Sequence, residues 1–116
     1  MAVEEGDDVC IGQLLFEDKR RSGIRFTSPA GGKVVAIHRG SKRRLLSVVI
    51  DVASSEESEA FEVGGKRPED LDADTVRKAL VESGLWTGLR TRPYSKVPLP
   101  DQVAHSIFVT AIDTNP

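Results

Sequence analysis

A chain of 116 residues can bury one modest hydrophobic core and is too short for two independent ones. Its 16 basic and 18 acidic side chains give a net charge of −2, which excludes a global attraction to nucleic acid or to an anionic membrane surface. The longest apolar run, residues 45–52, is much shorter than the roughly 20 residues of a membrane-spanning helix. Because Cys10 has no second cysteine to pair with and the start carries no signal-peptide pattern, we expect a reducing, cytoplasmic location.

Short segments of strand-forming residues, separated by polar turns, fill the first half of the chain. The stretch EGDDV at residues 5–9 predicts a turn. Strands are then predicted at four places: Ile11–Glu17, Ile24–Thr27, Lys33–His38 and Leu45–Val52. Turn-to-turn spacings of about ten residues favour a compact all-β module over residues 1–52.

The composition changes at Ala53. Residues 54–74 hold eight acidic side chains against only Lys66 and Arg67, with a Gly-Gly pair and few large apolar groups. This composition is typical of a solvated linker, which we place at residues 53–71.

A helix is predicted in the final segment, residues 72–116. Asp72 or Asp74 can cap its N-terminus, and apolar residues recur at helical spacing from Val76 to Leu80. Gly84 is placed to end the helix in the left-handed conformation, with Leu85 and Trp86 following at once.

Beyond the helix the sequence favours extended structure. Arg90–Pro100, RTRPYSKVPLP, is too rich in proline for a helix or a central strand and predicts an ordered, extended segment. Ile107–Ile112 is apolar at nearly every position and predicts a strand covered on both faces. The fold class is therefore α+β, mainly β. Because residues 1–3 leave no room for the strand that should precede EGDDV, and the chain stops just after the strong strand signal IFVTAID, we expect the chain to be a piece of a longer protein.

Basic residues cluster in two of the predicted turns. If both turns lie at the same end of the β-module, they form one patch suited to an acidic protein surface, phosphate or lipid headgroups. The alternative is that they only keep the turns soluble. Few aromatic residues interleave with them, so single-stranded nucleic acid is not expected as a partner. The patch consists of Lys19, Arg20, Arg21, Arg25, Arg39, Lys42, Arg43 and Arg44.

Lys19 is also a candidate for covalent modification. Small β-modules of the lipoyl and biotinyl type carry their group on a lysine at the tip of a two-residue hairpin turn, and Asp18-Lys19 lies in a turn. The following Arg20, Arg21, Ser22 and Gly23 make this loop longer and more basic than that hairpin. A solvated turn lysine is the favoured interpretation, with the carrier domain kept as the alternative.

The segment Ser83–Pro100 contains the only tryptophan, the only tyrosine, two arginines and three prolines. A rigid backbone with aromatic faces and guanidinium groups suits a ligand edge or a contact with another protein chain. The alternative is a purely structural strap in which the tryptophan plugs the core. The interaction candidates are Trp86, Arg90, Arg92, Pro93, Tyr94 and Lys96.

Motifs for catalysis or metal binding are not recognisable in the sequence. Cys10, His38 and His105 lack metal-ligand spacing and form no local nucleophile arrangement. The stretch GGKVVAI lacks the pattern of a phosphate loop or a dinucleotide fingerprint. We therefore expect no catalytic residues and no metal in this chain.

Two long stretches nevertheless carry a resemblance to one known family. The first is EGDDVCIGQLLFEDKRRSGIRFTSPAGGKVVAIHRGSKRRLLSVVIDV, and the second is SGLWTGLRTRPYSKVPLPD with IFVTAIDTNP. Together they resemble the A subunit of the sodium-translocating NADH:ubiquinone oxidoreductase. The first is similar to the family's N-terminal lipoyl-like barrel-sandwich portion, and the second is similar to the next portion of the family's chain. The resemblance covers nearly the whole chain and weakens between about Ala53 and Pro68.

The resemblance implies a peripheral subunit on the cytoplasmic side of a bacterial inner membrane, in a complex that passes electrons from NADH to quinone and pumps sodium. Its expected partners are the other subunits, through which alone it would meet the membrane. In that family the flavins and the iron–sulfur centre belong mainly to other subunits, and the A subunit has been linked to quinone binding. No covalently bound cofactor is expected here, and ubiquinone is left open for the longer protein. The expected role is assembly of subunits, with a purely structural module as the alternative.

Overall fold

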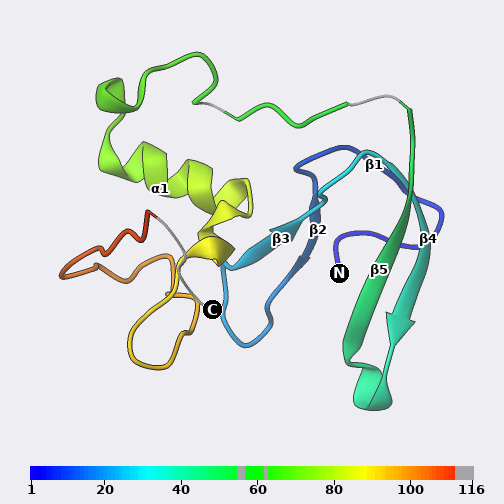
Figure 1. The fold of residues 1–116 in the computed structure, drawn as a ribbon. Helices are drawn as coiled ribbons and strands as arrows, with labels where there is room; N and C mark the ends of the chain where they lie inside the picture. The colour runs from blue at the N-terminus through cyan, green and yellow to red at the C-terminus, as the bar shows by residue number, and fades with distance from the viewer. Residues whose placement is uncertain (55–56, 62, 112–116) are drawn as a thin grey trace.

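The computed structural model describes residues 1–54, 57–61 and 63–111 (Figure 1). The strands are β1 (Asp8–Val9), β2 (Leu14–Glu17), β3 (Arg25–Thr27), β4 (Gly32–Arg39) and β5 (Leu45–Val52). The helical elements are the α-helix α1 (Ala73–Glu82) and three short 3-10 turns, η1 (Ser41–Arg43), η2 (Pro68–Asp70) and η3 (Leu85–Gly88).

The strands form two antiparallel sheets. β4 pairs with β1 on one side and β5 on the other, whereas β2 and β3 pair, within the part of the chain that the structure describes, only with each other. The register places Val34 opposite Ile50 and Val9 opposite Gly32. Residues 5–9 were predicted as a turn, but Asp8 and Val9 belong to β1, because they lie beside the start of β4 and pair with it.

The core of the β-module lies between the two sheets. Its buried side chains are Val3, Val9, Leu15 and Val34, with Phe16, Ile37, Val48 and Ile50 packed against them. Phe16 and Phe26 stack with their ring centroids 4.7 Å apart. The alternation expected of β4 is visible in this packing, because Val34 is fully buried whereas its neighbour Val35 is exposed.

Part of the predicted linker lies against the β-module. Ile11 donates its N–H to Glu57 O at 2.9 Å and accepts from the N–H of Glu59 at 2.8 Å, which makes a short parallel bridge. Phe61 lies over Gly12, where an added Cβ would be 3.4 Å from its ring. Residues 57–61 are therefore held to the β-module by backbone hydrogen bonds, while residues 57–60 remain exposed to solvent.

The helix forms as the sequence predicts. Asp72 is its N-cap, and the side chain accepts a hydrogen bond from the N–H of Thr75 at 2.8 Å. Gly84 follows the helix with φ of +79°, in the left-handed region. The turn at Gly84 leads directly into η3, which contacts β3 and so joins the helix to the β-module.

The end of the chain differs from the prediction. Among residues 107–111 no strand is present, and Phe108 is 89% exposed. A strand needs a neighbour that satisfies its backbone groups and covers its faces, and within the described ranges no strand pairs with this segment. Ile112, which ends the predicted strand, lies outside the described residues.

Candidate functional site: a basic cavity between the β2–β3 loop and the strap

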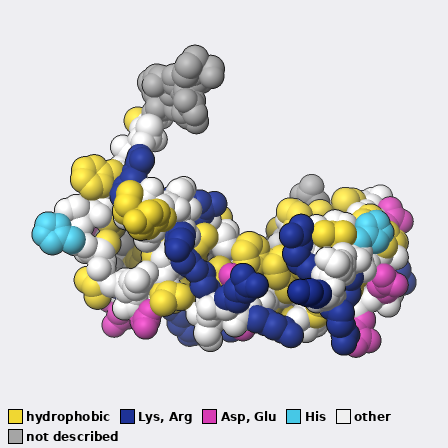
Figure 2. Space-filling view, turned by 90° about the horizontal axis from the view of Figure 1, so that it is seen from below, with side chains coloured by type: hydrophobic (Ala, Val, Ile, Leu, Met, Phe, Trp, Pro, Cys, Tyr) yellow, Lys and Arg dark blue, Asp and Glu magenta, His cyan; other side chains and the backbone are white. Residues whose placement is uncertain are grey.

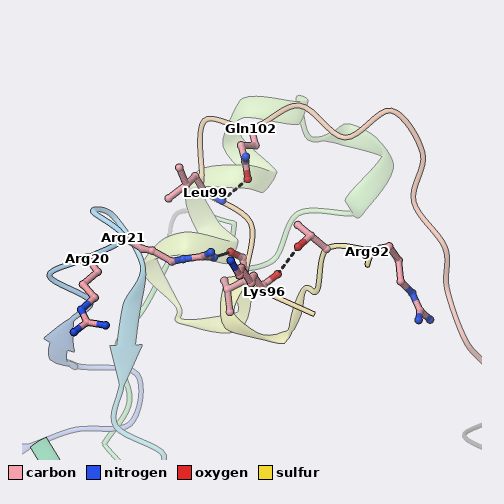
Figure 3. A pocket seen from close by; sticks show the side chains of 8 residues that line it. Arg20, Arg21, Arg92, Lys96, Leu99 and Gln102 are labelled. Carbon is pink, nitrogen blue, oxygen red and sulfur yellow. Dashed lines mark hydrogen bonds between the residues drawn. The ribbon is translucent and has the colours of Figure 1, made fainter. Parts of the chain in front are cut away.

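A cavity of about 500 Å³ lies between the loop that joins β2 to β3 and the segment 89–102, called the strap below (Figure 3). It combines two parts of the chain that are far apart in sequence. The lining residues are Arg20, Arg21, Thr91, Arg92, Lys96, Val97, Leu99 and Gln102.

The β2–β3 loop places two arginines at this cavity. The N–H of Asp18 bonds to Ile24 O at 3.0 Å and closes the base of the loop, and the Asp18 carboxylate accepts from the N–H of Arg20 at 2.8 Å. The guanidinium of Arg21 extends to the strap and donates to Val97 O (Figure 3). Arg21 therefore ties the loop to the strap.

The strap holds its shape through its own hydrogen bonds. The N–H of Thr91 and its Oγ1 both donate to Lys96 O, at 2.8 and 3.0 Å, which closes a turn over residues 91–96. Trp86 Nε1 donates to Pro98 O at 2.9 Å. The N–H of Leu99 bonds to Gln102 Oε1 at 2.8 Å. These bonds fix the far wall of the cavity although the strap contains no helix or strand among its described residues.

The charge at the cavity is of one sign. Four of the eight lining side chains, Arg20, Arg21, Arg92 and Lys96, are cationic, and none is acidic. None of the four makes an ion pair with a residue that the structure describes. Arg25, on the neighbouring strand, differs in this respect, because its Nε lies 3.3 Å from Glu17 Oε1.

The described residues contain neither a cluster of metal-binding side chains nor a membrane-spanning helix. Within residues 1–54, 57–61 and 63–111, no three His, Cys, Asp or Glu side chains are grouped so that they could hold a metal ion. In the same ranges, no helix has both the length and the apolar character needed to cross a membrane.

Comparison with known proteins identifies the two halves of the chain. Residues 1–53 match the NqrA N-terminal barrel-sandwich hybrid domain, and residues 71–116 match the NqrA second alpha/beta domain. This chain belongs to the NqrA family. The barrel-sandwich fold and the family expected from the sequence are thereby confirmed.

Several curated proteins are similar over the whole chain. The A subunit of the Na(+)-translocating NADH-quinone reductase of Vibrio anguillarum is 53% identical over 116 residues, which is 100% of this chain and 26% of that protein. The proteins of the same name from Neisseria meningitidis and Alcanivorax borkumensis are 53% and 52% identical, with the same coverage. The chain thus spans about a quarter of the length of these NqrA relatives.

The interaction candidates between Trp86 and Lys96 separate into buried and exposed residues. Trp86 was expected on a contact surface, but it is only 8% exposed and its indole is bonded to Pro98 O, so it packs inside. Tyr94 is 78% exposed, and its ring lies 5.6 Å from Lys96 Nζ. The remaining candidates, Arg90, Arg92, Pro93 and Lys96, are also exposed.

The basic turns lie at the same end of the molecule. In Figure 1 the β2–β3 loop and the turn at η1 both point to the lower end, and Figure 2, seen from below, shows Lys and Arg side chains over much of that end. The two-turn arrangement on which the predicted patch depends is therefore present. The exposed members are Lys19, Arg20, Arg39, Lys42, Arg43 and Arg44, and a binding role for the patch stays a prediction.

Lys19 is exposed in a loop that is wider than a two-residue hairpin turn. The bond from Asp18 N to Ile24 O leaves residues 19–23 to span the turn. This geometry does not favour the carrier alternative.

The cavity between the β2–β3 loop and the strap could not be predicted from the sequence. Arg21 and Val97 are 76 residues apart, and no local pattern signals their contact.

Proposed function

We propose that this chain forms the N-terminal part of the A subunit of a sodium-translocating NADH–quinone reductase. The observation that carries the proposal is the similarity to curated proteins of that name at 53% identity along all 116 residues. The order of the two matched domains along the chain supports it. In this proposal the chain is a peripheral part on the cytoplasmic side of the membrane, and it reaches the membrane only through other subunits.

Within such a complex, the proposed role of the chain is to contact a neighbouring subunit through the exposed edge of the strap. Arg90 holds its guanidinium against the backbone by donating to Thr87 O and to Leu89 O, and Arg92 has no acidic partner among the described residues. Tyr94 adds exposed aromatic surface close to them. An edge with pre-ordered arginines and a tyrosine suits a partner that presents carboxylates around an apolar centre.

Quinone is proposed as a ligand of the complete protein because the relatives are named quinone reductases. The cavity of this chain is lined largely by charged side chains, whereas a quinone is neutral and largely apolar. An apolar ligand prefers apolar walls with few polar groups. We therefore assign assembly to the strap and do not assign the quinone-binding cavity to these residues.

The test of membership is a purification of the full-length protein from its host. The tagged protein is extracted gently from membranes, and sodium-stimulated NADH:quinone reductase activity is measured in the eluate. Activity that co-purifies with the tag is the expected result. A full-length protein that remains outside membranes and free of partners would contradict the proposal.

The test of the strap is the double substitution Arg90→Ala with Arg92→Ala in the full-length protein. We expect at least a tenfold loss of assembled complex with an unchanged circular dichroism spectrum, because exposed side chains leave the fold intact. The matched control is Lys33→Ala with Lys66→Ala, which removes two exposed cations outside both the strap and the basic patch. Normal assembly of the strap variant, or equal loss in both variants, would remove the strap from the contact.

A further inference from the structure

We propose that the basic cavity binds the phosphate group of a small molecule. The proposal rests on the walls of the cavity and on its unpaired charge, and it does not depend on the function proposed above. The strap edge considered there faces outward: in Figure 3 the Arg92 guanidinium points away from the other labelled side chains. The phosphate site is assigned to the other three cations that line the cavity, the half-buried Arg21 and the exposed Arg20 and Lys96.

These three residues come from two walls whose backbones are held by hydrogen bonds. Arg20 lies on a loop closed by the bond from Asp18 N to Ile24 O, and Lys96 lies at the end of the turn closed by Thr91. Arg21 joins the two walls by its bond to Val97 O (Figure 3). A site built in this way is ordered before a ligand arrives, which lowers the entropic cost of binding.

Like charges gathered without counter-charges favour the binding of an external anion. The three cations assigned to the site raise the local positive potential, and a hollow with protein walls focuses that potential more than a flat surface does. Guanidinium groups present paired N–H donors that match phosphate oxygens, and an ammonium adds a point charge. Gln102 accepts from Leu99 with its side-chain oxygen and keeps its NH₂ group as a further donor.

Size and charge select the class of anion. The volume of about 500 Å³ lies in the range of small-molecule sites, roughly 300–1,000 Å³, so a compact ligand fits better than an acidic protein segment. A phosphate monoester carries about −1.5 to −2 charges at pH 7, which matches several cations at once, whereas a carboxylate carries one. The phosphate can belong to a soluble metabolite or to a lipid headgroup, because the recognition chemistry is the same.

The experiment measures binding of inorganic pyrophosphate to the full-length protein by calorimetry, with citrate as a polycarboxylate comparison. Binding to vesicles that contain phosphatidic acid, whose headgroup is a phosphate monoester, is measured in parallel, with phosphatidylcholine vesicles as reference. The cavity variant is Arg20→Gln with Lys96→Gln. Arg21 is left intact, because its bond to Val97 O holds the walls together. The matched control is Lys33→Gln with Lys66→Gln, which removes the same charge from exposed positions outside both the cavity and the basic patch.

We expect pyrophosphate to bind more tightly than citrate, and the cavity variant to weaken this binding at least tenfold while the control changes it less than twofold. Vesicle binding that is lost only in the cavity variant, without binding of pyrophosphate, also supports the proposal and assigns the phosphate to a lipid. Three results would overturn it. The first is an absence of binding to both pyrophosphate and the anionic vesicles. The second is an equal weakening of binding in the cavity variant and the control variant. The third is citrate binding as tight as that of pyrophosphate.

Discussion

Asp72 connects the charge of one side chain to the start of α1. Its carboxylate accepts from the N–H of Thr75 at 2.8 Å and from Thr75 Oγ1 at 2.7 Å. These bonds, the backbone bond first, hold the pKa of Asp72 below its ordinary value of 3.8, because they stabilise the ionised form. The sequence predicts this cap, since an aspartate precedes the apolar periodicity and both partners are local.

A pH dependence of α1 results from this lowered pKa. A carboxyl group whose folded pKa is depressed contributes stability above its unfolded pKa, and the contribution is lost as the pH falls through the folded pKa. Asp72→Asn keeps a capping side chain but cannot titrate. We therefore expect the variant and the parent to have similar helix content at pH 7. As the pH falls from about 4 to 2, only the parent should lose the contribution of this group.

The measurement is helix content by circular dichroism against pH, with a carboxyl NMR titration of Asp72 in the parent. The NMR titration should give an Asp72 pKa below 3.8. An Asp72 midpoint at or above that value, or identical acid profiles for the two proteins, would show that the hydrogen bonds to Thr75 do not hold the charge.

At the scale of elements, β4 is the strand on which the β-module depends, because it pairs with β1 and β5 together. At its first residue, Gly32, the backbone has φ of +154° and lies against β5. A Cβ added there would be 2.1 Å from Asp51 O and 2.9 Å from Asp51 C. Both atoms belong to the backbone of the partner strand, so relief would require the two strands to separate.

The substitution Gly32→Ala is therefore expected to destabilise the protein by about 3 kcal/mol or more, at the upper end of overpacking effects. The control is Gly88→Ala, where an added Cβ has no neighbour within 4 Å. That change should stay within about 0.5 kcal/mol, as surface substitutions usually do. Urea unfolding of both variants measures the two changes in stability. Similar midpoints would mean that the backbone of β5 at Asp51 moves away from the added Cβ at little cost.

The elements that the sequence predicts well are those with local signals. β2 to β5 follow from alternation and turn residues, and α1 follows from its caps. β1 has only two residues, and they form a strand because they pair with β4. No local sequence pattern therefore predicts β1. The strand predicted at 107–112 shows the opposite error, since a strong apolar pattern there meets no pairing partner in the described chain.

At the scale of the whole molecule, two bodies meet through a small joint. One body is the β-module, and the other is formed by α1, η3 and the strap. The radius of gyration is 16.2 Å, compared with about 13 Å for a compact domain of this length. Thr27 on β3 donates to Ser83 O at 2.9 Å, and Gly84 lies directly on the Thr27 side chain. An added Cβ at Gly84 would be 2.6 Å from Thr27 Oγ1.

Substitution of Gly84 tests this joint. Gly84→Ala combines a left-handed backbone with a clash across the joint, whereas Gly65→Ala has nearly the same φ, +77°, and nothing within 4 Å. The shared backbone conformation costs an alanine about 1–2 kcal/mol. We expect Gly84→Ala to cost about 1–3 kcal/mol beyond that. Thermal unfolding of both variants, with hydrogen exchange at α1, measures the two losses of stability. Equal losses in the two variants would argue against a close contact between the bodies.

The sequence predicts the basic residues of the candidate site but not that they lie at one cavity. Arg20, Arg21, Arg92 and Lys96 stand out in the sequence because basic residues are dense in both segments. Their meeting at one cavity depends on a contact that spans 76 residues, which tertiary packing alone determines. Trp86 shows the same limit, since composition marks it as a contact residue whereas the fold turns its indole toward Pro98 O.

The exposed segment around Phe108 has a consequence for handling the protein in solution. Ile107, Phe108 and Val109 are each about four-fifths or more exposed, and the run IFVTA carries no charge and no proline. Short segments of this composition stack readily into intermolecular β-structure when they are unpaired. A partner surface that covered these side chains would therefore also protect the protein against fibril formation. A charged substitution at Phe108 is the simplest way to keep concentrated samples monomeric.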